Sequence, residues 1–308
     1  MLQITDQTTD QTTDQTTDQT TDQTTDQSYG WRRSKVQRIG SAGIISGQGE
    51  DGRHPMIFTE RSGYMNLHKK AVFFDVDDTM YDHLHPTRDA LRTVLGLSER
   101  FPYEEAYHRI RYYSDVLSAK GGLLEGKAGQ DELEDMREGR FVLALQEFGV
   151  NITREQAVDI QKEYLDRQYR IEPFEGATSL MDELSSAGYL VGLITNGLED
   201  HQMSKIRAMA LENHIAAEHI FVSGTVGYAK PDPRIFEVVN ERTGTLAEHC
   251  CYIGDSWRND VAGAVAANWR VIWFNHRKVA PESEVVGVYE TAASYSELKK
   301  LLLYPTYV

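Results

Sequence analysis

The chain has 308 residues and a formal charge of -15, because 47 Asp and Glu residues outnumber 32 Lys and Arg residues. A negative charge of this size disfavours contact with phosphate backbones, so we expect no nucleic-acid partner. The two adjacent cysteines, Cys250 and Cys251, cannot build a disulfide framework, and no apolar run approaches the ~20 residues needed to span a bilayer. We therefore expect a cytoplasmic protein with no membrane partner.

A four-residue repeat dominates the start of the chain. From Asp6 to Gln27 the unit Asp-Gln-Thr-Thr recurs without an apolar residue, so it cannot bury enough surface to offset the entropy of ordering. The repeat predicts that residues 1–64 form a disordered, low-complexity extension and linker. Order is expected to begin near Met65.

Short apolar, β-branched runs alternate with helical patterns in the rest of the chain. This alternation is typical of a parallel α/β sheet. We therefore expect an α/β fold with a Rossmann-like core, formed by residues 65–84 and 172–308. The expected strands are Ala71–Phe74, Tyr189–Thr195, His219–Ser223, Cys250–Gly254 and Arg270–Phe274.

Residues 85–171 differ from the core, because they contain no strand-like run. Stretches such as "DELEDMREGRFVLALQEFG" combine helical periodicity with dense charge. We expect a helical cap domain, inserted after the first strand and placed above the sheet.

Polar side chains follow the expected strands at their carboxyl ends, where open parallel sheets bind ligands. Asp75 and Asp77 follow the first strand, and in extended backbone they point to the same side. Each later element also has an ordinary interpretation, such as a helix cap for Asp260 or a surface position for Lys230. The later residues of this set are Thr195, Asn196, Lys230, Asp255 and Asp260.

Considered together, these residues favour a shared pocket that holds cations. The four carboxylates of Asp75, Asp77, Asp255 and Asp260 cannot share a pocket while ionised unless cations are present. Lys230 is one such cation. Mg²⁺ suits the rest, because it prefers a few carboxylates together with waters and substrate phosphate.

The ordered set "DVDDT", "TNG", the lysine of "AKPDP" and "GDSWRND" resembles motifs one to four of the haloacid-dehalogenase-like (HAD) hydrolase superfamily. Within it, the chain is most similar to capped phosphatases of the nucleotidase-like branch. The match spans residues from about Lys69 to Asn275. It implies a Mg²⁺-dependent phosphatase that hydrolyses a small phosphomonoester through an aspartyl-phosphate intermediate.

The resemblance also implies a role for each residue. Asp75 would be the nucleophile and a metal ligand, and Asp77 would be the acid and base, with its backbone carbonyl on the metal. Thr195 and Asn196 would hold the phosphoryl oxygens, while Lys230 would neutralise their charge. Asp255 would be the second carboxylate ligand of Mg²⁺. Asp260 would orient metal waters or Lys230 from just outside the ligand set.

Two acids of the first motif have different expectations. Asp77 acts as an acid only if its pKa rises above the free value of ~3.9, and we expect neighbouring carboxylates and partial burial to raise it. Its presence also favours phosphate esters over haloacids, as the family is known. Asp78 stands where the motif often has Gly, and neither Asp78 nor Asp82 is expected to take part in the chemistry.

Specificity is expected in the cap, because the core meets only the phosphate. Arg111, Tyr112 and Tyr113, and similarly Arg137 and Arg140, could reach the cleft, although packing or solvent exposure is the favoured interpretation for them. By resemblance, a nucleoside monophosphate is the favoured substrate. The alternatives are a phosphomutase and a non-catalytic phosphate-sensing or scaffold protein. A two-component receiver domain also combines Asp, Thr and Lys residues, but it would be far shorter than this chain. The choice between monomer and homodimer stays open.

Overall fold

The computed structural model describes residues 69–121, 129–284, 287 and 289–304, together with the backbone of four short strands nearer the amino terminus. These strands are β1 (Gln37–Ile39), β2 (Ile44–Gln48), β3 (Pro55–Thr59) and β4 (Ser62–Asn66), which pair in that order as an antiparallel sheet. They fall within or at the edge of the segment expected to be an extension and linker. Their apolar runs, such as "GIISG" and "PMIFT", carried a strand pattern that we passed over. The repeat lies outside the described residues.

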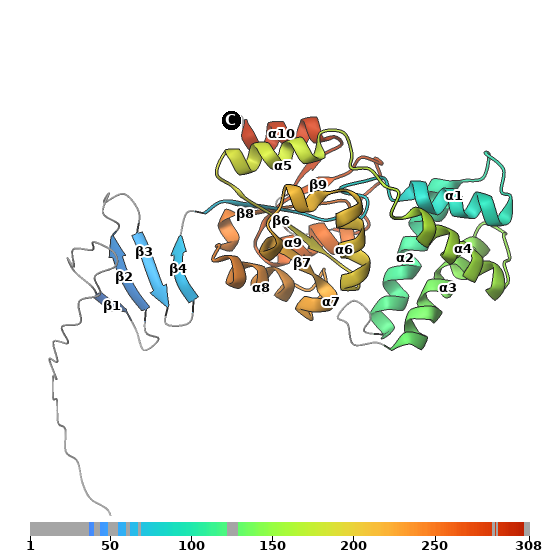
Figure 1. The fold of residues 1–308 in the computed structure, drawn as a ribbon, viewed down its shortest axis with the longest axis horizontal. Helices are drawn as coiled ribbons and strands as arrows, with labels where there is room; N and C mark the ends of the chain where they lie inside the picture. The colour runs from blue at the N-terminus through green and yellow to red at the C-terminus, as the bar shows by residue number, and fades with distance from the viewer. Residues whose placement is uncertain are drawn as a thin grey trace, which may run out of the picture.

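The core is a six-stranded sheet with the order β10-β9-β8-β5-β6-β7, and its described pairings are all parallel. Three of the expected strands have the predicted bounds and two are shorter by one residue at one or both ends, while the edge strand β10 was not predicted. The Rossmann-like α/β class is thus confirmed (Figure 1). The strands are β5 (Ala71–Phe74), β6 (Leu190–Thr195), β7 (Ile220–Val222), β8 (Cys250–Gly254), β9 (Arg270–Phe274) and β10 (Tyr289–Ala292).

Helices cover both faces of this sheet, and alternate residues of each strand pack against opposite layers. In β5, Val72 and Phe74 pack with α5 (Ala177–Ser186) and α10 (Tyr295–Leu303). On the other face, Phe73 packs with α8 (Arg234–Thr243) and α9 (Ala262–Ala266). Two further helices follow strands β6 and β7, namely α6 (Glu199–Ala208) and the short α7 (Ser223–Val226). The central strands are therefore buried on both faces, which fixes the positions of the residues that end them.

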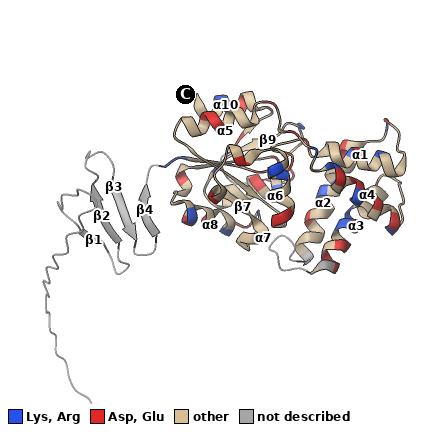
Figure 2. Ribbon diagram, viewed as in Figure 1, with Lys and Arg blue, Asp and Glu red and all other residues tan. Residues whose placement is uncertain are grey.

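The four remaining helices form a separate bundle at one end of the core (Figure 1). They are α1 (Leu84–Leu95), α2 (Tyr103–Gly121), α3 (Gln130–Gln146) and α4 (Arg154–Arg167). The bundle has its own apolar centre, in which Leu91, Ile110 and Phe141 are buried. Its outer surfaces carry both signs of charge, as Figure 2 shows. These helices occupy the segment where a helical cap was expected.

Two sequence observations bear on the environment of the chain. Cys250 and Cys251 are free and buried in β8, where they behave as small apolar residues. Within the described ranges, every helix is too short or too polar to cross a bilayer.

Candidate active site

The carboxyl ends of the central strands meet beneath the helical cap. Strands β8, β5 and β6 are parallel neighbours, so the residues that follow them reach the same edge of the sheet. A cavity of about 160 Å³ opens there between core and cap. Six of the seven expected site residues line it: Asp75, Asp77, Thr195, Asn196, Lys230 and Asp260. The seventh, Asp255, lines an adjoining hollow.

A buried lysine lies at the centre of the site. Lys230 Nζ donates hydrogen bonds to Asp75 Oδ1 and Asp260 Oδ1, both at 2.7 Å, and to the Tyr252 hydroxyl at 2.6 Å. Burial lowers the pKa of Lys230, but Asp260 and Asp75 outweigh that effect and raise it above the ordinary value. The ammonium is therefore charged and directed at the expected nucleophile.

Tyr252 is a member of this network that we did not predict. Its hydroxyl donates to the carbonyl of Ile194 at 2.6 Å while it accepts from Lys230. The contact links strand β8 to strand β6 directly below the site. A tyrosine within the apolar run "CCYIG" looks like an ordinary core residue, so no sequence signal marked it.

Three carboxylates form a cluster that suits a hard cation. One oxygen from each of Asp75, Asp255 and Asp260 lies within 4.8 Å of the others. Burial raises the pKa of Asp75 to about 7 against the opposing effect of Lys230, and burial also raises the pKa of Asp255 well above its usual range. Excess negative charge in a dry site is relieved by a cation, and an all-oxygen donor set fits Mg²⁺. The residues therefore fit the expected metal.

Asp77 has an environment that contradicts our expectation for its pKa. Lys205 Nζ lies 2.8 Å from both of its carboxylate oxygens, and the Tyr81 hydroxyl donates to it at 2.6 Å. Burial alone would raise the pKa of Asp77, but the ion pair with Lys205 outweighs it and holds the pKa well below its usual range. The expectation of a raised pKa is thus wrong for this state of the protein.

Lys205 was missed because its sequence context is ordinary. It lies on α6, in "HQMSKIRAM", where a lysine would normally face solvent. It is instead buried, and Gln202, one turn earlier, donates to the same Asp77 carboxylate at 3.1 Å. The spacing of three residues between Gln202 and Lys205 places both side chains on one face of the helix.

The two residues of the second motif are arranged differently from each other. Thr195 ends β6, and its side chain is buried at the cavity wall. The Asn196 side chain is engaged twice with the backbone of Lys230, since Nδ2 donates to its carbonyl at 2.8 Å and Oδ1 accepts from its N–H at 2.9 Å. Asn196 therefore holds the lysine loop in place, and a phosphate contact from this residue would come from its backbone N–H.

The fourth motif depends on a close approach of Asp260 to the chain at Gly254. A Cβ atom at position 254 would collide with the Asp260 carboxylate. With glycine there, Asp260 Oδ2 accepts from the backbone N–H of Ser256 at 2.8 Å while Oδ1 accepts from Lys230. Glycine at position 254 thus allows Asp260 to reach the lysine.

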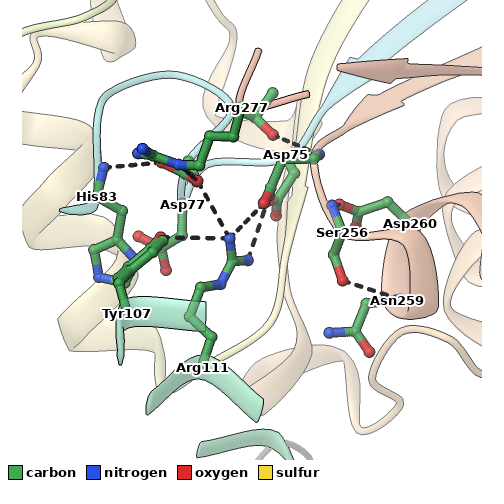
Figure 3. Close-up of polar contacts among 12 residues, drawn as sticks. Asp75, Asp77, His83, Tyr107, Arg111, Ser256, Asn259, Asp260 and Arg277 are labelled. Carbon is green, nitrogen blue, oxygen red and sulfur yellow. Dashed lines mark hydrogen bonds and ion pairs between the residues drawn. The ribbon is translucent and has the colours of Figure 1, made fainter. Parts of the chain in front are cut away.

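A cap residue contacts the cluster of three carboxylates formed by Asp75, Asp255 and Asp260. Arg111 of α2 is directed toward the strand ends, as Figure 3 shows, and its guanidinium forms a two-pronged ion pair with Asp255. The Nη2–Oδ1 distance is 3.3 Å. The backbone of Asp255 is fixed separately, because its N–H donates to Thr79 Oγ1 at 3.1 Å. Packing of cap against core or solvent exposure was the favoured interpretation for Arg111, and this ion pair is a contact between cap and core.

Asp78 belongs to a second ion-pair network, beside the site. Arg277 holds its carboxylate with two hydrogen bonds of 2.7 Å, and the same guanidinium lies 2.6 Å from Asp82. Asp78 has φ = 63°, which explains why glycine also suits this position. Burial alone would raise its pKa, but Arg277 holds it far below the usual range. Neither Asp78 nor Asp82 contacts Lys230 among the described residues, although Arg111 lies 3.6 Å from Asp78 as well as beside Asp255.

The other cap candidates divide into two groups. Arg137 and Arg140 of α3 line the cavity together with Ser114 of α2. Tyr113 instead donates to Glu147 at 2.6 Å, and the Arg109 guanidinium lies 4.3 Å from the centre of the Tyr112 ring. Tyr113 therefore packs within the cap, whereas Tyr112 also packs against the core, since the Arg258 guanidinium lies 5.1 Å from its ring centre. The arginine pair faces the cavity.

Comparison with known proteins agrees with this geometry. A family model described as haloacid dehalogenase-like hydrolase matches residues 69–268. Glyceraldehyde 3-phosphate phosphatase of Methanothermobacter thermautotrophicus is 28% identical over 76% of this chain and 99% of its own length. Phosphoserine phosphatase of Thermus thermophilus is 32% identical over 69% of this chain and 91% of its own length.

A solved structure gives the same result for the fold. The HAD hydrolase YfnB of Bacillus subtilis, in a magnesium-bound crystal form, is 25% identical and has a TM-score of 0.56. The alignment covers 77% of this chain and 99% of YfnB. The chain belongs to the haloacid dehalogenase-like hydrolase family.

Proposed function

We propose that the protein is a phosphoric monoester hydrolase acting on a small phosphate ester. The observation that carries this proposal is the buried contact between Lys230 Nζ and Asp75 Oδ1, 2.7 Å long, at the wall of the cap-covered cavity. A carboxylate held by an ammonium in a desolvated cleft is suited to attack phosphorus while the lysine offsets the charge of the phosphoryl group. The phosphatase names of the two relatives support the same reaction.

In the proposed first step, a carboxylate oxygen of Asp75 attacks the phosphorus atom. The bond from phosphorus to the ester oxygen breaks, and an aspartyl phosphate forms as the alcohol leaves. Thr195 and the backbone N–H of Asn196 would contact the phosphoryl oxygens, and Lys230 would neutralise them. Positioning and charge stabilisation of this kind account for most of the catalysis in phosphoryl transfer.

In the proposed second step, Asp77 acts as a general base toward the water that hydrolyses the aspartyl phosphate. The ionised form that Lys205 stabilises is the form a base requires. In the first step Asp77 would instead donate a proton to the oxygen of the leaving alcohol, and for this its carboxyl group needs a higher pKa. An anionic phosphoryl group next to Asp77 would shift the pKa in that direction, because a like charge disfavours ionisation.

Mg²⁺ is part of the proposal. Asp75 and Asp255 would hold it, with the Asp77 carbonyl as a further ligand and Asp260 beside the cluster. When bound, the cation would neutralise negative charge on the phosphoryl oxygens. The rest of the mechanism depends on the side chains described above.

The proposal is tested by a phosphate-release screen over sugar phosphates, glycolytic esters and nucleoside monophosphates, with and without Mg²⁺. Wild-type protein should release phosphate in proportion to the ester consumed, and Asp75→Asn should reduce the rate by at least about 1,000-fold, since no covalent intermediate can form. Turnover by Asp75→Asn at the wild-type rate would overturn the nucleophile assignment. Return of the phosphoryl group to a sugar would identify the phosphomutase instead.

A further inference from the structure

One face of helix α3 forms part of the cavity wall opposite the strand ends. Leu133, Met136, Arg137 and Arg140 all line the cavity. Their spacing of three, four and seven residues places them on one side of the helix. This face therefore combines two apolar and two basic side chains toward any bound ligand.

The other cations that line the cavity are already paired with carboxylates. Lys230 contacts Asp75 and Asp260, and Lys205 contacts Asp77. Arg111 is paired with Asp255. Within the part of the chain that the structure describes, no ion pair joins Arg137 or Arg140 to a carboxylate. These two arginines thus leave positive charge in the cavity without compensation from the protein.

Arg140 has an environment that is partly prepared for a ligand. Its Nη2 donates to Gln161 Oε1 at 2.7 Å, and its guanidinium lies 4.6 Å from the Phe141 ring centre and 5.2 Å from that of Tyr164. Its Nε atom is buried and has no hydrogen-bond partner among the described residues. A guanidinium stays charged, so an unused, buried N–H group on it carries a cost that an anion would offset.

An acidic side chain elsewhere in the cavity does not serve as that anion. Asp115 of α2 accepts a hydrogen bond from Asn259 Nδ2 at 3.2 Å, and burial raises its pKa. Asp115 shows no ion pair with either arginine in the described ranges. Among the described residues, then, no carboxylate pairs with either arginine, which leaves this position open to an anion on a ligand.

We propose that Arg137 and Arg140 form a subsite for a carboxylate on the substrate, at the end of the molecule opposite its phosphate. This inference rests on the proposed phosphatase function. A planar carboxylate can accept two hydrogen bonds from the fork of a guanidinium, and the unpaired Nε–H of Arg140 would supply one of them. The substrate class is then a short phosphorylated carboxylic acid.

The size of the cavity supports a short substrate. Its volume of about 160 Å³ is smaller than the ~300–1,000 Å³ that is typical of pockets for drug-sized ligands. A few carbon atoms between phosphate and carboxylate suit this space better than a nucleoside does. The apolar side chains of Leu133 and Met136 would cover that short carbon chain.

The experiment compares two esters that differ only at the distal group. The first is 3-phosphoglycerate, which has a carboxylate, and the second is glycerol 3-phosphate, which has a hydroxymethyl group there. Phosphate release gives kcat/KM for each ester, and p-nitrophenyl phosphate reports the basal reaction. The variants are Arg140→Gln, Arg140→Lys, Arg137→Gln and the control Arg154→Gln, in which an exposed cap arginine is changed.

Wild-type protein should prefer 3-phosphoglycerate by roughly 10- to 100-fold, the effect of a charge-assisted hydrogen-bond pair. Arg140→Gln should remove most of this preference through KM, and the ratio of kcat/KM for the two esters is the readout; turnover of p-nitrophenyl phosphate shows that the variant is a folded enzyme. Arg140→Lys should restore part of it, because charge is kept while the fork is lost. Arg154→Gln should behave as wild type.

Three results are distinguishable. If Arg140→Gln and Arg137→Gln both keep the wild-type preference for 3-phosphoglycerate, the subsite proposal is wrong. It is also wrong if wild-type protein cleaves p-nitrophenyl phosphate but shows no preference between the two other esters. If wild-type protein cleaves none of the three esters, the proposed phosphatase function itself is contradicted. Calorimetry with the Asp75→Asn variant measures binding without turnover. In this variant 3-phosphoglycerate should bind about tenfold more tightly than glycerol 3-phosphate. Adding Arg140→Gln should remove this difference in affinity.

Discussion

The ammonium group of Lys205 lies 2.8 Å from each carboxylate oxygen of Asp77, and this contact joins helix α6 to the loop after the central strand. Lys205 is buried, and Asp77 is the carboxylate that it contacts. The two residues therefore form a structural unit as well as part of the proposed active site. Their mutual dependence leads to the first prediction.

Lys205→Met should destabilise the protein and reduce activity together. Removing one partner of a buried ion pair leaves the other charge uncompensated, at a cost of about 3 kcal/mol in the free energy of unfolding. Phosphate release should fall at least about tenfold, because Asp77 loses the contact that orients it. Urea unfolding and the phosphate-release rate measure the two effects.

The control for Lys205→Met is Lys299→Met. Lys299 pairs with Glu183 at 2.7 Å, but both side chains are well exposed. Exposed pairs contribute little to stability, so this variant should behave as wild type in both assays. Equal effects of the two substitutions would show that the Lys205 contact has no special importance.

Arg111→Met should increase the affinity of the protein for Mg²⁺ in the absence of substrate. The guanidinium of Arg111 occupies the carboxylate of Asp255 and adds positive charge where the cation would bind. Its removal should lower the Mg²⁺ dissociation constant about tenfold. This change corresponds to only a small part of the repulsion energy between two positive charges at close range. Isothermal titration calorimetry measures this directly.

Arg109→Met is the matched control for Arg111→Met, because Arg109 pairs with Glu147 at the surface of the cap. It should leave Mg²⁺ affinity unchanged. Asp255→Asn should weaken Mg²⁺ binding in the same assay, since a carboxylate ligand is lost. Weaker binding by Arg111→Met would contradict competition between the arginine and the cation.

Substitutions of Asp78 should separate its charge from its backbone conformation. Asp78→Ala should cost about 3 kcal/mol, because Arg277 loses its buried partner, and should lower the melting temperature by roughly 6–12 °C. Asp78→Gly should be more stable than Asp78→Ala by about 1 kcal/mol, since φ = 63° is strained for alanine and free for glycine.

Thermal melting of these two variants and of Arg277→Met provides the measurement. The double variant Asp78→Ala with Arg277→Met should be less destabilised than the sum of the single changes, because both members of the buried pair are removed together. Strict additivity, or alanine more stable than glycine at position 78, would contradict the role that we assign to this ion pair.

Gly254→Ala should disrupt the lysine cluster without changing a polar group. The added methyl group would displace the Asp260 carboxylate, which then no longer supports Lys230. We expect a loss of about 2 kcal/mol in stability and about 100-fold in phosphate release. Gly139→Ala, in cap helix α3, is the control that should retain activity. A fully active Gly254→Ala would mean that Asp260 need not approach so closely.

His83 should make the protein less stable in mild acid. Burial lowers its pKa to about 3 in the folded protein, against about 6.5 in the unfolded chain. The unfolded chain therefore binds more protons between these values, so the stability contributed by His83 is present above pH 6.5 and is lost as the pH falls toward 3. The slope is up to about 1.4 kcal/mol per pH unit.

His83→Gln tests this dependence. At pH 7.5 the variant should be less stable by about 1 kcal/mol, because the hydrogen bond of 2.7 Å between His83 Nε2 and the Tyr164 hydroxyl is altered. The gap from wild type should close at about pH 5.8 and reverse by about pH 5, where the protonation of the unfolded chain costs wild type about 2 kcal/mol. Exposed His85→Gln should follow wild type throughout. A gap that stays constant with pH would show that His83 does not couple protonation to folding.

Much of the fold could be predicted because its signals are local. The buried strands are contiguous apolar runs, and the four motifs follow them, three directly and the lysine motif after the short helix α7. Their order in the sequence therefore implied convergence at one edge of the sheet. The edge strand β10 has the mixed sequence "YETA", which carries no such signal. Its identity as a strand depends on pairing with β9, a contact between distant segments.

The sequence by itself determined the family, the parallel sheet and the identity of the acids that meet at Lys230, since periodicity and ordered motifs are properties of the chain alone. Only the tertiary structure decided which other charged residues enter the site. Lys205, Arg111 and Arg140 each belong to a charged helix in which several positions look alike. Which of them meets a carboxylate, and which keeps an unused N–H group in the cavity, depends on the packing of cap against core and on the low dielectric that this packing creates.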